Sequence, residues 1–307
     1  MKDSPPDSGA SLRVHAALLL VQLAFGGFHV VAKAALTWLP PLAVVGLRVA
    51  LATPVLVLMA WRRDRFIPER RDLPRLALLG GLGVFANQIL FIVGLRHTTA
   101  TNAAILMPSL PVFAVAAASL LGIERVGPRR LAGILLSVAG ALVMVNPLRF
   151  SASPATALGN LLILVNCLCY ALFLVLQRPL LERIPWRTLI AWSFLFGGGG
   201  VLLVSLPWLA VVDYAAVPAR AWWGIAYIAA IGTVFAYAAN TWAVRRSSPS
   251  LVSAYNTVQP LVTAALAATF LGERFGWVEG VGLVLIVAGL WWVSVPPSER
   301  SREPAPG

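Results

Sequence analysis

The second half of this sequence repeats the first half at a fixed offset of 149 residues. Adding that number to a position in the first half finds the same residue again, as in Gly83 and Gly232, Arg96 and Arg245, Pro111 and Pro260, or Gly133 and Gly282. The dipeptides Glu124-Arg125 and Ala139-Gly140 recur as Glu273-Arg274 and Ala288-Gly289, and no gap separates these matches. The chain is therefore predicted to fold as two similar halves.

The composition places both halves in a membrane. Hydrophobic residues make up 59% of the 307 residues, charged residues 12%, and the mean hydropathy is +0.82, whereas soluble domains carry about 25% charged residues. At about 20 residues per crossing, the apolar segments predict an all-α protein with ten transmembrane helices. These helices are predicted at residues 13–36, 41–61, 76–95, 100–121, 131–147, 158–177, 188–208, 222–244, 250–271 and 277–295.

Five helices in each half is an odd number, so the second half is predicted to be inverted relative to the first, as in alternating-access transporters. With the N-terminus in the cytoplasm, eighteen of the 24 Lys and Arg residues fall on the cytoplasmic side and five on the other, as the positive-inside rule requires. Both termini are then cytoplasmic. The predicted organisation is a cytoplasmic tail (1–12), a first repeat (13–148), a periplasmic linker (149–157), a second, inverted repeat (158–295) and a cytoplasmic tail (296–307).

The repeated motifs resemble those of the EamA family within the drug/metabolite transporter superfamily. The resemblance rests on the two Glu-Arg pairs, each followed by a Gly-rich last helix, on Arg96 and Arg245, and on Pro111 and Pro260. It covers residues 13–295 and implies a ten-helix secondary transporter. The nearest resemblance is to amino-acid exporters of the YddG type. Relatives that carry sugar phosphates hold the phosphate with cationic cavity residues, for which this chain offers few candidates.

Polar side chains near the middle of five predicted helices mark a candidate substrate cavity. Such groups are costly in lipid and therefore face protein or a water-filled cavity. Amides can hold both the ammonium and the carboxylate of a zwitterion, and aromatic faces suit an apolar body or a cation. For any single residue, hydrogen bonding between neighbouring helices explains the pattern equally well. The predicted substrate-binding residues are Gln22, Phe25, His29, Asn87, Gln88, Tyr170, Tyr237, Asn240, Asn256 and Gln259.

Two charged groups within predicted helices have open roles. His29 is the obvious relay for proton coupling because its pKa is ordinarily near neutral, but a neutral donor lining the cavity is an equal alternative. Arg48 lies about a third of the way along the second helix. It either extends to the membrane interface or lines the outer vestibule, and contact with an anionic substrate group is its functional alternative.

Two features of the loops and bends complete the sequence-based expectations. Pro111 and Pro260 remove backbone hydrogen bonds in repeat-related helices, so these residues are candidate hinges, with a static kink as the alternative. Glu124 and Arg125 are expected to form an interfacial ion pair at the turn between the fourth and fifth helices. We favour a structural cap over a gate for this pair.

The function that these observations favour is secondary transport, most readily the export of neutral or aromatic amino acids across the inner membrane. Export of organic cations, drugs or phosphorylated metabolites is the alternative. An integral-membrane enzyme is disfavoured because no cluster of Asp, Glu or His lies near a helix end. The expected partners are a small-molecule substrate and the lipid bilayer, with no nucleic acid, cofactor or metal, and the protein is expected to be a monomer or a homodimer.

Overall fold

The computed structural model describes residues 11–150, 153–262, 265 and 277–294, apart from the side chains of residues 27–30, 32–34, 100–101, 149 and 279. All regular structure in this part of the chain is helical. The elements are α1 (Leu12–Ala35), α2 (Pro41–Arg63), η1 (Arg70–Asp72), α3 (Leu73–Gly80), η2 (Gly81–Ala86), α4 (Asn87–His97), α5 (Ala100–Leu106), α6 (Ser109–Leu120), α7 (Pro128–Val145), η3 (Pro147–Arg149), α8 (Pro154–Leu181), α9 (Trp186–Ala210), α10 (Ala219–Ala229), η4 (Ala230–Phe235), α11 (Ala236–Arg246), α12 (Pro249–Ala254), η5 (Tyr255–Val258) and α14 (Trp277–Ser294).

Seven helical segments of the described chain are long and apolar enough to cross a membrane, so this is a multi-pass membrane protein. Two further apolar helical stretches, within α1 and α14, are shorter. The total of ten crossings and the placement of the termini remain predictions. The seven segments are Pro41–Arg63, Arg70–His97, Asn102–Leu120, Pro128–Val145, Pro154–Leu181, Trp186–Ala210 and Ala219–Arg246.

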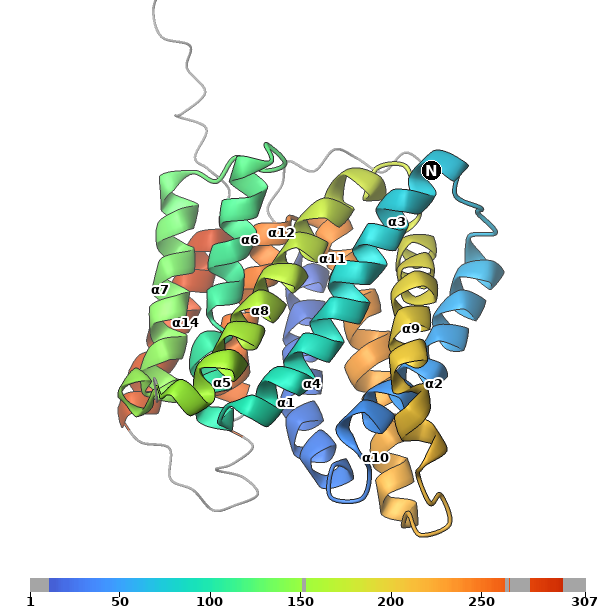
Figure 1. Ribbon diagram of the computed structural model, residues 1–307. Coiled ribbons are helices and arrows are strands. Elements are labelled where there is room, and N and C mark those ends of the chain that lie inside the picture. The colour runs from blue at the N-terminus through green and yellow to red at the C-terminus, as the bar shows by residue number, and fades with distance from the viewer. Residues whose placement is uncertain (1–10, 151–152, 263–264, 266–276, 295–307) are drawn as a thin grey trace, which may run out of the picture.

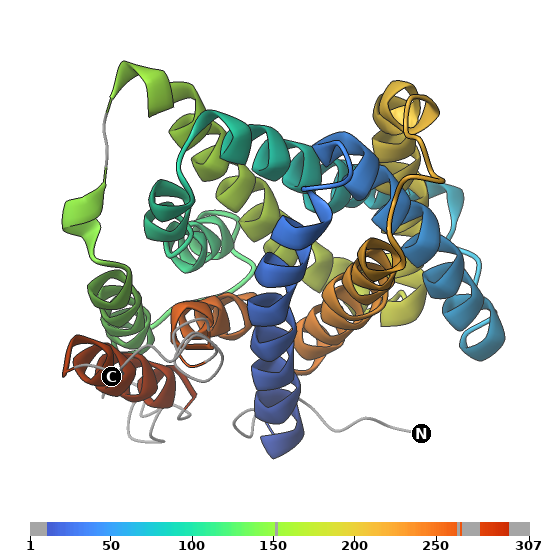
Figure 2. The ribbon, with the colours of Figure 1, turned by 90° about the horizontal axis from the view of Figure 1, so that it is seen from below.

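Helices of the two repeats interleave rather than forming two separate bundles. The α2–α3 and α6–α7 connections lie at the upper end of the molecule, and the α1–α2 and α9–α10 connections at the lower end (Figure 1). Helix α2 packs on α9, α8 packs against α4 and α6, and α1 runs along α10 and α11. Helices α7 and α14 lie side by side at one edge, away from α2 and α9 (Figure 2). The centre is therefore built from segments of both repeats.

The last helix of each repeat crosses the other through paired glycines. A methyl group added at Gly133 would lie 2.7 Å from the carbonyl oxygen of Gly289, and one added at Gly140 would lie 2.8 Å from that of Gly282. Exchanging the repeats converts the first contact into the second, as a two-fold relation requires. Small residues let two helix backbones approach this closely. This close packing is thus made between the two halves of one chain.

The third segment of each repeat contains a short π-helix at an equivalent place. Element η2 covers Gly81–Ala86 and η4 covers Ala230–Phe235, so their boundaries differ by the repeat offset. The Thr233 hydroxyl donates to the Ile228 carbonyl at 2.9 Å, five residues earlier. The sequence analysis expected unbroken helices in both places. π-Helical turns leave backbone groups with altered partners and are frequent at functional sites.

The fourth segment of the first repeat is broken at Pro108, three residues before Pro111. Helix α5 ends at Leu106 and α6 begins at Ser109. Pro111 has no N–H for the carbonyl four residues earlier, that of Met107. The Leu110 N–H instead donates to this carbonyl at 3.1 Å, which tightens the turn.

The corresponding segment of the second repeat follows the same pattern. Helix α12 gives way to the 3-10 turn η5, and the Gln259 N–H donates to the Asn256 carbonyl. Pro260 follows directly, at the offset of 149 from Pro111. Both candidate hinge prolines therefore sit just after a real interruption. Whether the interruptions bend during function stays a prediction.

Acidic side chains of the first repeat hold the second repeat at the upper end of the molecule. Asp64 follows α2 and accepts hydrogen bonds from Arg187 at 3.1 Å and from the Thr188 hydroxyl at 3.2 Å, both in the first turn of α9. Asp72, which is 3% exposed, pairs with Arg183 at 2.5 Å. These contacts join loops that are far apart in sequence.

The expected pairing of Glu124 with Arg125 is wrong. Glu124 pairs with Arg130 in α7, and its other oxygen accepts from the backbone N–H and the hydroxyl of Ser250, at 3.2 and 2.8 Å. Arg130 also donates to the Ser248 hydroxyl at 2.6 Å. Because the first N–H groups of a helix have no partner within it, the Glu124 carboxylate acts as a cap for α12.

The sixth helix is longer than predicted. Helix α8 begins at Pro154 and continues to Leu181, beyond both ends of the helix predicted at 158–177. Proline is well suited to the first turn of a helix because its missing N–H would be unsatisfied there anyway.

Candidate functional site

Tyr237 joins the two repeats at the centre of the molecule. It lies in the first turn of α11, directly after η4, and is 3% exposed. Its hydroxyl lies 3.0 Å from the Gly83 carbonyl in η2 and 3.1 Å from Asn87 Oδ1, and shares its proton between these acceptors. The π-helical turn of the first repeat is thereby tied to a residue that follows the π-helical turn of the second.

Three further aromatic rings surround Tyr237. Phe194 meets it edge-on with ring centroids 5.1 Å apart, Tyr170 does so at 6.0 Å, and Phe173 lies tilted at 6.2 Å. The Phe173 ring packs directly on Gly83, where a methyl group would overlap it. Edge-to-face pairs add to the stabilisation from burial alone. We call Tyr170, Phe173, Phe194 and Tyr237 the aromatic cluster.

Amide side chains border the aromatic cluster. Asn240 Nδ2 donates to the Tyr170 hydroxyl at 2.9 Å, and Asn166 Nδ2 donates to the Asn87 carbonyl. The Asn240 Oδ1 atom has no protein partner although the residue is 1% exposed. Buried polar atoms ordinarily have partners, so this acceptor is a candidate contact for a solute.

Gln88 and Tyr237 occupy equivalent positions of the two repeats and lie beside one another. The pseudo-two-fold relation between the repeats therefore passes close to this pair. Gln88 is 4% exposed, and its side-chain amide lies within reach of the Tyr237 hydroxyl. Arg48 in α2 lies within electrostatic range of Tyr237. The site thus combines amide donors and acceptors, one guanidinium group and aromatic faces.

Half of the predicted substrate-binding residues meet in this region, namely Asn87, Gln88, Tyr170, Tyr237 and Asn240.

The other predicted residues are not shown to join them. Gln22 is fully buried in α1 with both amide atoms unpartnered. Phe25 is half-buried in the same helix, and the side chain of His29 lies outside the described residues. Asn256 donates to the Ser253 carbonyl in its own turn at 3.1 Å, and Gln259 is half-buried just beyond η5.

Two residues, Phe194 and His15, were not predicted from the sequence. Phe194 lies in a largely apolar stretch of α9, where nothing distinguishes it from a lipid-facing phenylalanine. His15 lies near the start of α1, and its Nδ1 is 2.5 Å from the Tyr255 hydroxyl in η5. The 240-residue separation of this pair leaves no local signal in the sequence.

The model of the EamA-like transporter family matches residues 12–146 and 157–295 of this sequence. The two matched stretches correspond to the two repeats. This chain belongs to the EamA-like transporter family. Membership identifies it as a membrane transporter rather than an enzyme.

Relatives of this EamA-family chain span plants, archaea and bacteria. It is 27% identical to "Protein WALLS ARE THIN 1" of Arabidopsis thaliana, over 95% of this chain and 85% of that protein. It is 28% identical to an "Uncharacterized transporter" of Archaeoglobus fulgidus, over 91% and 96%, and 25% identical to the "Uncharacterized transporter YetK" of Bacillus subtilis, over 97% and 90%. A solved crystal structure aligns with a TM-score of 0.76 at 16% identity, covering 92% of this chain and 96% of the other, which supports the fold.

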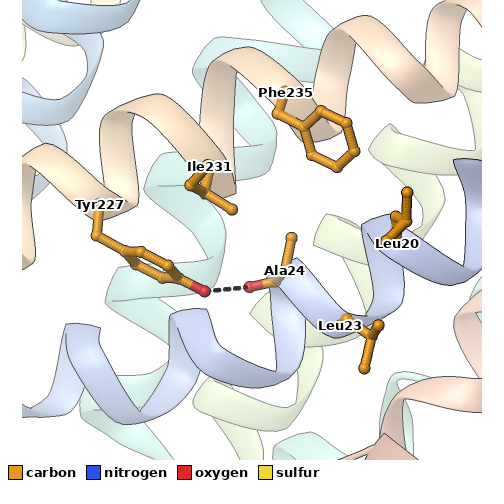
Figure 3. A pocket seen from close by; sticks show the side chains of 6 residues that line it. All are labelled: Leu20, Leu23, Ala24, Tyr227, Ile231 and Phe235. Atoms are coloured by element: carbon orange, nitrogen blue, oxygen red, sulfur yellow. Dashed lines mark hydrogen bonds between the residues drawn. The ribbon is translucent and has the colours of Figure 1, made fainter.

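A surface pocket of the EamA-family chain is lined by none of the predicted substrate-binding residues. It measures about 330 Å³ and is lined by Leu20, Leu23, Ala24, Tyr227, Ile231 and Phe235 from α1, α10 and η4 (Figure 3). The Tyr227 hydroxyl donates to the Ala24 carbonyl at 3.4 Å across it. Leu20 and Leu23 are about half exposed. This apolar groove opens on the lipid-facing surface and offers little to orient a polar solute.

Proposed function

We propose that this protein is a secondary transporter that exports small metabolites, most readily neutral or aromatic amino acids, across the inner membrane by alternating access. The observation that carries the proposal is the contact between the aromatic cluster and the two π-helical turns. The residues that we propose bind the solute therefore lie beside interrupted helices, at the interface of the two repeats. Interrupted helices at a repeat interface are where secondary transporters bind their substrates.

The chemistry of the site supports an amino acid as the solute. The rings of Tyr170, Phe173 and Phe194 provide faces for an apolar or aromatic side chain. Buried amides, among them Gln88 and Asn240, provide donors and acceptors for the charged ends. Binding sites of this kind combine apolar walls with a few polar groups that fix orientation.

The orientation of the protein follows from the sequence. We propose ten crossings with both termini in the cytoplasm, because the excess of Arg residues falls on that side. Localisation to the plasma (inner) membrane is supported by the similarity to the Bacillus subtilis transporter.

Counterflow in proteoliposomes tests the proposed function. Vesicles that contain the purified protein are loaded with unlabelled phenylalanine, and the uptake of labelled phenylalanine is followed against protein-free vesicles. We expect transient accumulation that requires internal unlabelled solute. Absence of counterflow for phenylalanine, tryptophan, leucine and alanine from well-folded protein would contradict the amino-acid assignment. Counterflow of organic cations or sugar phosphates instead would establish the alternative substrate class.

A further inference from the structure

We propose that Arg48 binds the carboxylate group of the transported solute, so that the protein prefers carboxylates to amines that lack one. This inference rests on the proposed function, since it assigns the substrate class of the same site. It starts from the position of Arg48 in α2.

Arg48 lies at the border between the buried and the exposed face of a membrane-spanning helix, with its Nε shielded from solvent. On one side lie Val45, Ala52 and Leu56, which are 3%, 0% and 0% exposed. On the other side lie Leu51 and Val55, which are about half exposed. Arg48 is about 10 Å along the axis from Pro41, at about 1.5 Å per residue. A charged group at this depth marks a functional site by default.

The surroundings of Arg48 match the rest of an amino acid. Arg48 is half-buried, its Nε is shielded from solvent, and it lies within electrostatic range of Tyr237. Beside Tyr237 lies Gln88, whose side-chain amide is buried within reach of the Tyr237 hydroxyl. A guanidinium group binds carboxylates through paired hydrogen bonds, and an amide N–H adds a further donor.

The opposite end of the solute has a complementary acceptor. Asn240 Oδ1 is buried without a protein partner, while Asn240 Nδ2 is held by the Tyr170 hydroxyl. An amide oxygen and an aromatic face both favour an ammonium group. The described acidic side chains lie at helix ends or in loops: Asp64, Glu69, Asp72, Glu124, Glu182 and Asp213. The chemistry of the site therefore favours a carboxylate at Arg48 over a solute that carries only positive charge.

Selectivity between two matched solutes tests this assignment. Counterflow of labelled phenylalanine and of labelled phenylalaninamide, which lacks the carboxylate, is measured for wild type, Arg48→Gln, Arg48→Lys and Arg62→Gln. Arg62 is an exposed arginine at the end of the same helix, so Arg62→Gln is the control for a loss of charge. For Arg48→Gln, we expect phenylalanine transport to fall at least tenfold while the phenylalaninamide rate stays within twofold. Arg48→Lys keeps the charge but not the paired donors, and it should retain part of the preference.

The outcomes separate this inference from the proposed function. Equal loss of both solutes in a folded Arg48→Gln or Arg48→Lys protein would show a structural role and overturn the carboxylate assignment alone. An unchanged preference for phenylalanine in either variant would do the same. If wild type carries neither solute, the proposed function fails and the assignment fails with it. Should Arg48→Gln not fold, the Arg48→Lys protein decides through its ratio of the two rates.

Discussion

The Tyr237 hydroxyl group links the two repeats of this protein at their centre. It donates a hydrogen bond shared between the Gly83 carbonyl and Asn87 Oδ1, and both acceptors belong to the other repeat. The ring meanwhile packs against Phe194. One residue therefore contributes to the stability of the centre and to the surface on which we propose that the solute binds.

Replacing Tyr237 with Phe should lower both the stability of the protein and its transport of phenylalanine. The ring contacts remain, but the Gly83 carbonyl and Asn87 lose a donor, and an unsatisfied buried acceptor costs about 1–3 kcal/mol. We expect a lower unfolding temperature in detergent and a several-fold loss of phenylalanine counterflow. Tyr214→Phe is the matched control, because Tyr214 is exposed and bonds only the Leu209 carbonyl. Equal effects of the two substitutions would contradict a special role for Tyr237.

At the scale of the elements, helix interruptions distinguish this protein from a plain bundle. The π-helical turns η2 and η4 and the breaks beside Pro111 and Pro260 occur at equivalent places of the two repeats. Each interruption changes the partner of a backbone carbonyl. The Gly83 carbonyl in η2 is available to Tyr237 in this way.

A pair of glycines within η2 tests how tightly this element is packed. Gly83→Ala would drive a methyl group into the Phe173 ring, whereas a methyl group at Gly81 meets nothing within 4 Å. Overpacking of this kind costs about 1–3 kcal/mol. We expect Gly83→Ala to lower the thermal stability clearly and Gly81→Ala to leave it nearly unchanged. Similar stability of the two variants would mean that the Phe173 ring moves freely.

Removing the prolines should change the motion of the fourth segments. In Pro111→Ala and Pro260→Ala, an N–H becomes available to the carbonyl of Met107 or Asn256, so the helix can continue through the break. We expect thermal stability to be equal or higher and counterflow to be several-fold slower. Pro54→Ala, at a proline within α2, is the comparison. Undiminished counterflow in both fourth-segment variants would identify the breaks as static kinks.

At the scale of the whole molecule, the contacts between the repeats differ in kind from one place to another. The edge formed by α7 and α14 is held by close backbone packing at glycines. The upper end is held by ionic contacts from Asp64, Asp72 and Glu124 to donors that include residues of the second repeat. Close packing tolerates little displacement, whereas a few polar contacts can be exchanged for water. We therefore expect the upper end to open more readily than the α7–α14 edge.

Glu124→Gln should loosen the upper end. The substitution weakens the contact with Arg130 and the cap on Ser250, because hydrogen bonds to a charged group are the stronger ones. In detergent, we expect a several-fold increase in the rate at which a cysteine at Ser253, which is fully buried, reacts with a water-soluble maleimide. Glu69→Gln removes one partner of an exposed ion pair with Arg71, and the rate should then stay unchanged. Protection that persists in Glu124→Gln would show that packing alone closes this end.

The repeated helices and the family could be predicted from the amino-acid order. Apolar length, the offset of 149 residues and the glycines of the last helices are local or periodic patterns, and each reports directly on burial in lipid or on helix contact. The polar residues near the middle of the helices were also visible, because lipid penalises such groups wherever they occur. Five of the ten predicted site residues meet at the centre for this reason.

The partners of these residues depend on the tertiary structure. Phe194 and His15 look ordinary in the sequence, and Glu124 bonds across to α12 rather than to its neighbour Arg125. The π-helical turns are stabilised by contacts such as that between Tyr237 and Gly83, which span 154 residues. Hydrophobic periodicity records which face of a helix is buried, but not which distant segment covers it. The segment that covers each face is determined by packing and by hydrogen bonds between residues that are distant in sequence. A single stretch of sequence does not specify these contacts.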